Sequence, residues 1–297
     1  MVKRRRNIFI AACLAPALIL FGVFVIYPVI QGFILSFYRW SGLTRGTEVF
    51  IGFGNFETLF QDHIFWKALV NNLILLMVVP PVTMMLAMSF AYFITNRNLK
   101  ESGFFKVVYY FPNVMSVVAI SVMWSFVYNP NRGILNAALK SVGLDHLAAP
   151  WLGDPSTALF SVAATMIWAT LGGYMLLYVA AMQRIPNDLY EAARIDGANA
   201  FKQFTKLTFP LIIDVTRISI IFFFTNVFNN GFTYVRVMTP GGGPNHATQI
   251  LGSYMYFQAF ERFNLGYATA IALFMFILLL ILSLISNFIT KREQVTY

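Results

Sequence analysis

The sequence predicts an all-α membrane protein, a bundle of six transmembrane helices. Hydrophobic residues make up 58% of the 297 residues, charged residues only 11%, and the mean hydropathy is +0.67. Soluble domains carry about 25% charged residues, so this composition indicates a membrane protein. Long apolar runs recur along the chain, and stretches rich in Pro, Gly and Asn, such as "TPGGGPNHAT", separate them.

About 20 apolar residues are needed to cross a bilayer. Six segments of the chain meet this length, and we expect them to form one membrane domain over residues 1–297: 8–37, 68–93, 107–128, 158–182, 207–229 and 266–289. The prolines inside these segments are expected to bend the helices without breaking them, because neighbouring helices can satisfy the freed backbone groups.

The only cysteine, Cys13, excludes an intrachain disulfide, a zinc cluster or an iron–sulfur centre. The apolar stretch before it, Ile8 to Ala12, is too short for a cleaved lipoprotein signal. We therefore expect an uncleaved first span with a buried thiol.

The distribution of Lys and Arg predicts the orientation, because basic residues concentrate on the cytoplasmic side. This rule also explains the net charge of +9 without a nucleic-acid partner. If the N-terminus is inside, the cytoplasmic set is Lys3, Arg4, Arg5, Arg6, Arg97, Lys100, Lys106, Arg184, Arg194, Lys202, Lys206, Lys291 and Arg292. The external set is the smaller one: Arg39, Arg45, Lys67, Arg132, Lys140, Arg236 and Arg262. Both termini are therefore expected in the cytoplasm.

The segment between spans four and five, residues 186–210, is charged and Ala-rich and includes "EAARIDGANAFKQFTKLTFP". Asp188 is expected to cap a helix together with Glu191, as in a capping box. Gly197 can adopt the positive φ that ends a helix, and Pro210 is expected to open the next span. Without further information, this segment could equally be an interfacial helix lying on the bilayer.

The exact spacing resembles the integral membrane subunits of ATP-binding-cassette (ABC) importers that use a substrate-binding protein. Their signature is Glu-Ala-Ala, three residues, Gly, nine residues, an aliphatic residue, one residue, then Leu-Pro. Here the matching residues are Glu191-Ala192-Ala193, Gly197, Leu207 and Phe209-Pro210. Leu207 and Phe209 replace the usual Ile and Leu, which are mild apolar changes.

Three further stretches resemble the branch that imports di- and oligosaccharides and glycerol 3-phosphate. They are Thr239–Pro244 in an external loop, Tyr254–Phe260, and Gly266–Ala270 at the entry to the last span. The Thr239–Pro244 loop is one residue longer than the pattern of that branch. The resemblance covers essentially the whole chain.

The resemblance implies a permease subunit in a prokaryotic cytoplasmic membrane, paired with a second six-span permease. A cytoplasmic ATPase dimer would hold ATP and magnesium, and an external binding protein would deliver a sugar. This chain would bind no cofactor of its own. The segment between spans four and five would be the coupling helix that docks on the ATPase, through Asp188, Leu189, Glu191, Ala192, Ala193, Asp196, Gly197 and Phe201.

The sequence offers no signs of an enzyme. It has no Walker A pattern, its three histidines lack metal-ligand spacing, and no nucleophile–base arrangement is evident. The main alternative is a self-sufficient secondary carrier or channel for a small polar solute. Such proteins place ionisable residues within the membrane, whereas here only Asp214 and Arg217 lie near a span, where they are spaced to form a structural pair.

Residues with hydrogen-bonding or aromatic side chains in spans four and five, together with one glycine, are candidates for sugar contacts. They are Gly173, Tyr174, Asn226, Asn229 and Asn230. The glycines of "LGGY" could open space for a ligand, and the amides could bind hydroxyl groups. The alternative is that these small and amide residues serve helix packing.

Overall fold

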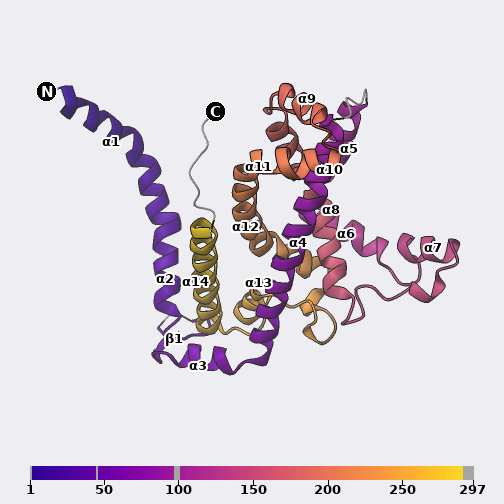
Figure 1. Ribbon diagram of the computed structural model, residues 1–297. Helices are drawn as coiled ribbons and strands as arrows, with labels where there is room; N and C mark the ends of the chain where they lie inside the picture. The colour runs from indigo at the N-terminus through magenta and orange to yellow at the C-terminus, as the bar shows by residue number, and fades with distance from the viewer. Residues whose placement is uncertain (1, 45, 97–100, 290–297) are drawn as a thin grey trace. The chain divides into compact units, whose positions relative to one another are not determined.

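The computed structural model describes residues 2–44, 46–96 and 101–289. The chain forms two compact units, one of residues 1–62 with 255–277 and one of residues 63–254 with 278–297. Both are built almost entirely of helices (Figure 1). Five of the basic residues used to predict the orientation lie outside the described residues: Arg45, Arg97, Lys100, Lys291 and Arg292.

The first unit begins with a long apolar helix made of α1 (Val2–Phe21), the π-helical η1 (Gly22–Ile26) and α2 (Tyr27–Leu35). From Phe9 to Leu35 the helix is long and apolar enough to cross a membrane. Cys13 is exposed on it, so the expectation of a buried thiol is wrong. From Phe9 onward the helix is apolar on all sides, and its side chains from Phe9 to Val29 remain largely uncovered by the rest of the unit.

A short two-stranded antiparallel sheet follows, which the all-α prediction did not include. It pairs β1 (Tyr38–Arg39) with β2 (Val49–Phe50). Asn55, on α3 (Gly54–Gln61), fixes the chain before it by donating to the carbonyl oxygens of Ser36 and Tyr38 at 2.8 and 2.9 Å. The π-helical η6 (Phe257–Glu261) precedes α14 (Leu265–Ile289).

The close approach of α14 to this sheet requires Gly266. Its amide donates to the carbonyl oxygen of Trp40 at 3.1 Å. A Cβ at position 266 would lie 2.0 Å from the carbonyl oxygen of Tyr38, so any side chain there would push the two segments apart.

The second unit is built around α4 (His63–Asn96) and α8 (Ala158–Met182), which pack along each other. Pro80 and Pro81 lie inside α4, which stays continuous, as the sequence predicts. The third predicted span is different, because it consists of α5 (Ser102–Val114) and α6 (Val117–Val127), bent by 100° at extended Met115 and Ser116. Here the expectation of an unbroken helix is wrong, and the break follows Pro112 within one turn.

Between α6 and α8 lie α7 (Ile134–Ser141) and the 3-10 turn η2 (Asp145–Leu147). After α8 the chain forms α9 (Asn187–Ile195), α10 (Ala200–Gln203), the π-helical η3 (Phe204–Thr208) and α11 (Phe209–Leu211). A 71° bend separates this run from α12 (Ile213–Met238). Pro210 therefore lies just before the long helix and does not open it, and α12 continues nine residues beyond position 229, where the fifth span was expected to end.

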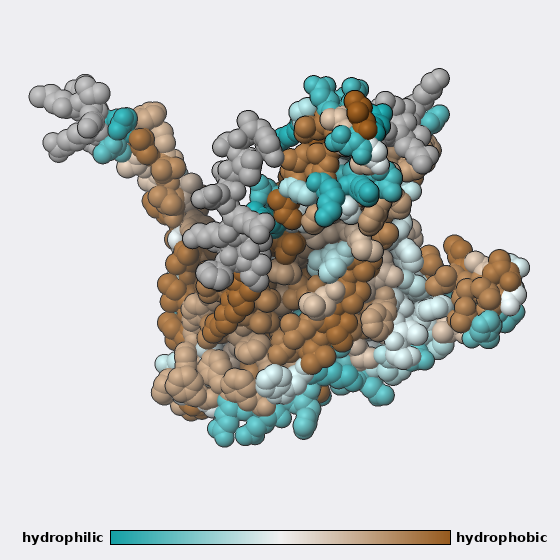
Figure 2. Space-filling model, in the orientation of Figure 1, coloured by the Kyte–Doolittle hydropathy of each residue, from teal (hydrophilic) through white to brown (hydrophobic). Residues whose placement is uncertain are grey.

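Two 3-10 turns, η4 (Pro240–Gly242) and η5 (Pro244–His246), follow α12 and lead to α13 (Leu251–Tyr256). In the described part of the chain, four helices are long and apolar enough to cross a membrane, or up to six if each bent pair is one span. Within the second unit, hydrophilic residues gather over α9 and α10, whereas α4 and α12 carry mostly hydrophobic ones (Figure 2).

Candidate functional site

The α9–α11 segment, residues 186–210, forms a helix–turn–helix. Helix α9 starts at Asn187, with Pro186 as its N-cap and no side-chain capping bond. The predicted capping box of Asp188 and Glu191 is therefore wrong, because the N-cap is Pro186 and the helix begins two residues too early for Asp188 to cap it. Asp188 lies in the first turn instead, where its negative charge stabilises the helix dipole.

Helix α9 ends in the geometry that the sequence predicts. Gly197 has a φ of +73°, the amide of Gly197 bonds to the carbonyl of Arg194 at 3.1 Å, and the amide of Ala198 bonds to the carbonyl of Ala193 at 2.9 Å. These two bonds define a Schellman motif. Asn199 then caps α10, since its Oδ1 accepts a hydrogen bond from the amide of Lys202 at 2.9 Å. The turn between the two helices is thus fixed by backbone geometry.

Three large apolar side chains of this helix–turn–helix are exposed, and together we call Leu189, Ile195 and Phe201 the exposed apolar face. Their exposed fractions are 41%, 87% and 74%. Glu191, Ala192 and Asp196 are also exposed, and Ala193 is half-buried. Large apolar side chains exposed on an otherwise charged segment are typical of a protein contact surface.

Ile195 was not among the residues singled out from the sequence. The signal that could have found it is its position directly before Asp196-Gly197, where the helix ends and a side chain of the last turn projects from the segment.

The opposite side of α9 is anchored through Tyr190. This side chain is 7% exposed, and its hydroxyl shares a 2.9 Å hydrogen bond with the hydroxyl of Thr208 in η3. Burial raises the pKa of Tyr190 above its usual value of 10.0, partly offset by the bond to Thr208. Because Tyr190 joins α9 to the end of η3, the helix–turn–helix is closed into one compact body.

The residues predicted to contact substrate lie on α8 and α12. The ring of Tyr174 stacks on Phe223, with centroids 4.0 Å apart and planes at 12°. Asn226 and Asn230 follow Phe223 by three and seven residues, so they flank this contact on α12. They are half-buried, Asn229 is exposed, and none of the three amides forms a side-chain hydrogen bond within the described ranges.

The glycines of α8 serve packing and leave no open space. A Cβ at Gly172 would lie 1.9 Å from the carbonyl oxygen of Tyr109, and one at Gly173 would lie 2.9 Å from Oδ1 of Asn113. Both neighbours belong to α5, so the glycines allow α5 and α8 to approach closely. The expectation that they make room for a ligand is therefore wrong for this conformation.

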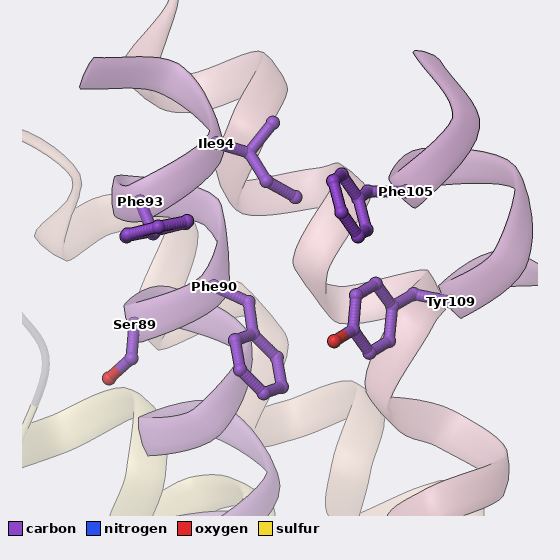
Figure 3. Close-up of a pocket in the computed structure, with 6 residues that line it drawn as sticks. All are labelled: Ser89, Phe90, Phe93, Ile94, Phe105 and Tyr109. Carbon is purple, nitrogen blue, oxygen red and sulfur yellow. The ribbon is translucent and has the colours of Figure 1, made fainter. Parts of the chain in front are cut away.

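A cavity of about 390 Å³ lies between α4 and α5 and includes none of the predicted substrate residues (Figure 3). Its lining is mostly aromatic: Ser89, Phe90, Phe93, Ile94, Phe105 and Tyr109. The rings of Phe90 and Tyr109 stack at 5.0 Å, and the hydroxyl of Ser89 already donates to the carbonyl of Met85. Few polar groups remain for the hydroxyl groups of a sugar.

The acid–base pair at the start of α12 is structural, as its spacing predicts. Arg217 donates to Oδ1 of Asp214 at 2.7 Å, and the Asp214 side chain is 62% exposed. Among the residues that the structure describes, no group of three or more His, Cys, Asp or Glu side chains is arranged to hold a metal ion.

Residues 59–294 match the family described as binding-protein-dependent transport system inner membrane component. The chain belongs to this family. It is a multi-pass subunit of an inner-membrane transport system, and the family is one of transport permeases, not enzymes.

Three similar proteins are permease components. The chain is 36% identical to the probable ABC transporter permease protein YurN of Bacillus subtilis, over 95% of this chain and 96% of that protein. It is 35% identical to the diacetylchitobiose uptake system permease protein NgcF of Streptomyces coelicolor, over 89% and 77%. It is 31% identical to the lactose transport system permease protein LacF of Rhizobium radiobacter, over 94% and 93%.

The fold is that of a solved ABC importer permease. A chain in the crystal structure of a bacterial alginate ABC transporter, in complex with an alginate pentasaccharide-bound periplasmic protein, aligns with a TM-score of 0.84. The alignment covers 97% of this chain and 96% of that one, at 23% sequence identity.

Proposed function

We propose that this chain is the permease subunit of an ABC importer for a di- or oligosaccharide, and that the α9–α11 segment is its coupling helix. The observation that carries the proposal is the exposed apolar face. It lies on the segment that bears the Glu-Ala-Ala-x3-Gly signature, and in a cytoplasmic loop it requires a protein partner. The sugar class is supported by the names of NgcF and LacF.

In this proposal each bent helix pair is one span, which gives six spans with both termini in the cytoplasm. A second permease completes the translocation path, and an ATPase dimer that holds ATP and magnesium docks on the exposed apolar face. A binding protein delivers the sugar at the other side of the membrane. Closure of the ATPase dimer shifts the permease pair between inward- and outward-facing states, by as much as the two states differ in their affinity for the ATPase.

The path for the sugar is proposed to run beside α8 and α12, near Tyr174, Asn226 and Asn230. The stacked Tyr174–Phe223 pair offers an aromatic surface, and the amides on α12 lack protein partners within the described ranges. Hydrogen-bond donors and acceptors next to aromatic rings suit a polar ligand with apolar ring faces. Asn229 and Gly173 are weaker candidates. Asn229 is exposed, and the space beside Gly173 is occupied by the side chain of Asn113.

The test is affinity purification of the tagged chain from its native membrane in mild detergent, with mass spectrometry of the copurified proteins. We expect a second permease and an ATPase with a P-loop, and we expect Ile195→Asp and Gly197→Pro to lose the ATPase but keep the permease. Ile134→Asp is the matched control, since Ile134 is 71% exposed on α7, away from the segment. An oligomer of this chain alone would contradict the proposal and favour a self-sufficient carrier.

A further inference from the structure

We infer that Tyr92 is the positioning residue that makes α4 follow the α9–α11 segment when that segment moves. The inference rests on the proposed function, since it concerns how a displacement applied by an ATPase travels into the membrane domain.

Near one end of α4, Tyr92 contacts the two elements that precede α11, namely α10 and η3. Its hydroxyl donates to the carbonyl oxygen of Ala200 at 3.0 Å, and its ring meets Phe204 edge-on with centroids 5.2 Å apart. Ala200 is the first residue of α10, and Phe204 is the first residue of η3. A single side chain therefore links α4 to two elements of the segment.

The part of the chain that connects α10 to α12 is bent. It passes through the π-helical η3 and then through Ile212, where the chain bends by 71° before α12 starts. Short helices joined by such breaks can change their angle, as hinge residues do. A displacement of α9 and α10 could thus be absorbed at Ile212, and the contact of Tyr92 with α10 bypasses this bend.

The other end of α4 is tied to the loop that follows α12, which we call the Gly-rich loop (residues 239–250). Nδ2 of Asn71 donates to the carbonyl oxygens of Ala247 and Gln249 at 3.0 and 2.8 Å. Nζ of Lys67 donates to the carbonyl oxygen of Asn245. In addition, the amide of Leu251, directly after the loop, donates to Oδ1 of Asn72 at 2.8 Å.

Between these two ends α4 is an uninterrupted helix of 34 residues, about 50 Å long at 1.5 Å per residue (Figure 1). All the hydrogen bonds described, at both ends, go to backbone groups of the partner segments. A continuous helix whose two ends are hydrogen-bonded to other segments moves as one body with those segments. Tyr92 therefore connects the α9–α11 segment to the Gly-rich loop along α4.

The test measures the distance between spin labels on α4 and on the segment, in the complete transporter reconstituted in lipid. The labels replace Met85, which is 69% exposed on α4, and Lys202, exposed on α10, in a Cys13→Ser background. With Tyr92 present, we expect a narrow distance distribution that magnesium and ATP do not change. In Tyr92→Phe, which removes only the hydroxyl, we expect ATP to shift and broaden it.

The loss of one hydrogen bond should raise the population of unlinked conformers about two- to tenfold. Tyr110→Phe is the matched control, because Tyr110 lies on α5, is 38% exposed and forms no hydrogen bond or ring contact with the segment among the described residues. A distance that ATP changes in the presence of Tyr92 would overturn the inference, and so would a Tyr92→Phe distribution equal to that of the unmodified chain.

The inference and the proposed function fail separately. An ATPase that stays bound to Ile195→Asp contradicts the docking face and thus the proposed function. If instead Ile195→Asp releases the ATPase while Tyr92→Phe leaves the spin-label distances unchanged, only the role of Tyr92 is wrong.

Discussion

The α9–α11 segment and the Gly-rich loop lie at the two ends of α12, and they use similar residues in opposite ways. Each contains at least one glycine with positive φ, an isoleucine and polar side chains that order the turn. In the segment, Ile195 is 87% exposed and Gly197 has no atom near the position of a Cβ. In the loop, Ile250 is fully buried and Gly242 is enclosed by Gln249.

The Gly-rich loop is built into the fold, whereas the α9–α11 segment is open for the contact that we propose with a partner. Hydrogen bonds to α4 and buried side chains fix the Gly-rich loop from within the chain. The α9–α11 segment satisfies its own backbone but leaves large apolar side chains uncovered, which supports the proposed docking of an ATPase there. Three matched pairs of substitutions test this distinction.

The largest difference is expected from placing a charge at the two isoleucines. Ile250→Asp puts a carboxylate into a fully buried site and should destabilise the chain by about 4 kcal/mol or more. Ile195→Asp should change the free energy of unfolding by less than about 0.5 kcal/mol, because the side chain is exposed. Thermal unfolding of the purified chain in detergent measures both, and equal losses would show that Ile195 is covered within the chain.

The two glycines should differ next. In Gly242→Ala, the new Cβ would lie 1.6 Å from Oε1 of Gln249 at a φ of +87°, so overpacking adds to backbone strain and the expected cost is about 2–5 kcal/mol. In Gly197→Ala only the strain at +73° remains, about 1–2 kcal/mol. Thermal unfolding shows which variant loses more stability. If Gly197→Ala lost as much as Gly242→Ala, the turn at Gly197 would not have free space for a Cβ.

Two asparagines provide the third pair. Asn71→Ala leaves two buried carbonyl groups without their donor, and we expect a loss of about 2–4 kcal/mol. Asn199→Ala removes one exposed helix cap and should cost about 1 kcal/mol. Limited proteolysis can locate the effects, since Asn199→Ala should expose only the α9–α11 segment to cleavage. Cleavage within 239–250 in that variant would mean that the two regions unfold together.

The sequence predicted the features that depend on local chemistry. The apolar runs, the helix that ends at Gly197 with a positive φ, and the Asp214–Arg217 pair all follow from residue type and spacing. The Glu-Ala-Ala signature indicated the family, which the match over residues 59–294 confirms. The coupling role of the segment and the sugar contacts remain predictions.

The features that the sequence did not predict depend on residues far apart in the chain. Whether Pro112 bends or breaks a helix is decided by its neighbours, as continuous α4 with Pro80 and Pro81 shows. The role of Gly172 became clear only once α5 was seen to lie against it. Likewise, Tyr92 is separated by 108 residues from the carbonyl group that it binds.

The smallest predicted effect concerns Tyr190 and depends on pH. Burial raises the pKa of its hydroxyl above 10.0, so the folded segment favours the neutral form. Below pH 10 the group is neutral in both the folded and unfolded states, and its contribution to stability is complete. As the pH rises through 10 towards the higher folded-state pKa, the unfolded state ionises first, and this stability is lost.

Between pH 9 and 11 we therefore expect the midpoint of thermal unfolding to fall more steeply for the unmodified chain than for Tyr190→Phe. Thr208→Val serves as the control, because it removes the hydrogen bond but leaves a titratable phenol in place. It should lower the midpoint at pH 8 and retain the pH dependence. Equal slopes for the unmodified chain and Tyr190→Phe would mean that α9 opens independently of the rest of the second unit, and the segment would then transmit force through Tyr92 without the anchor at Thr208.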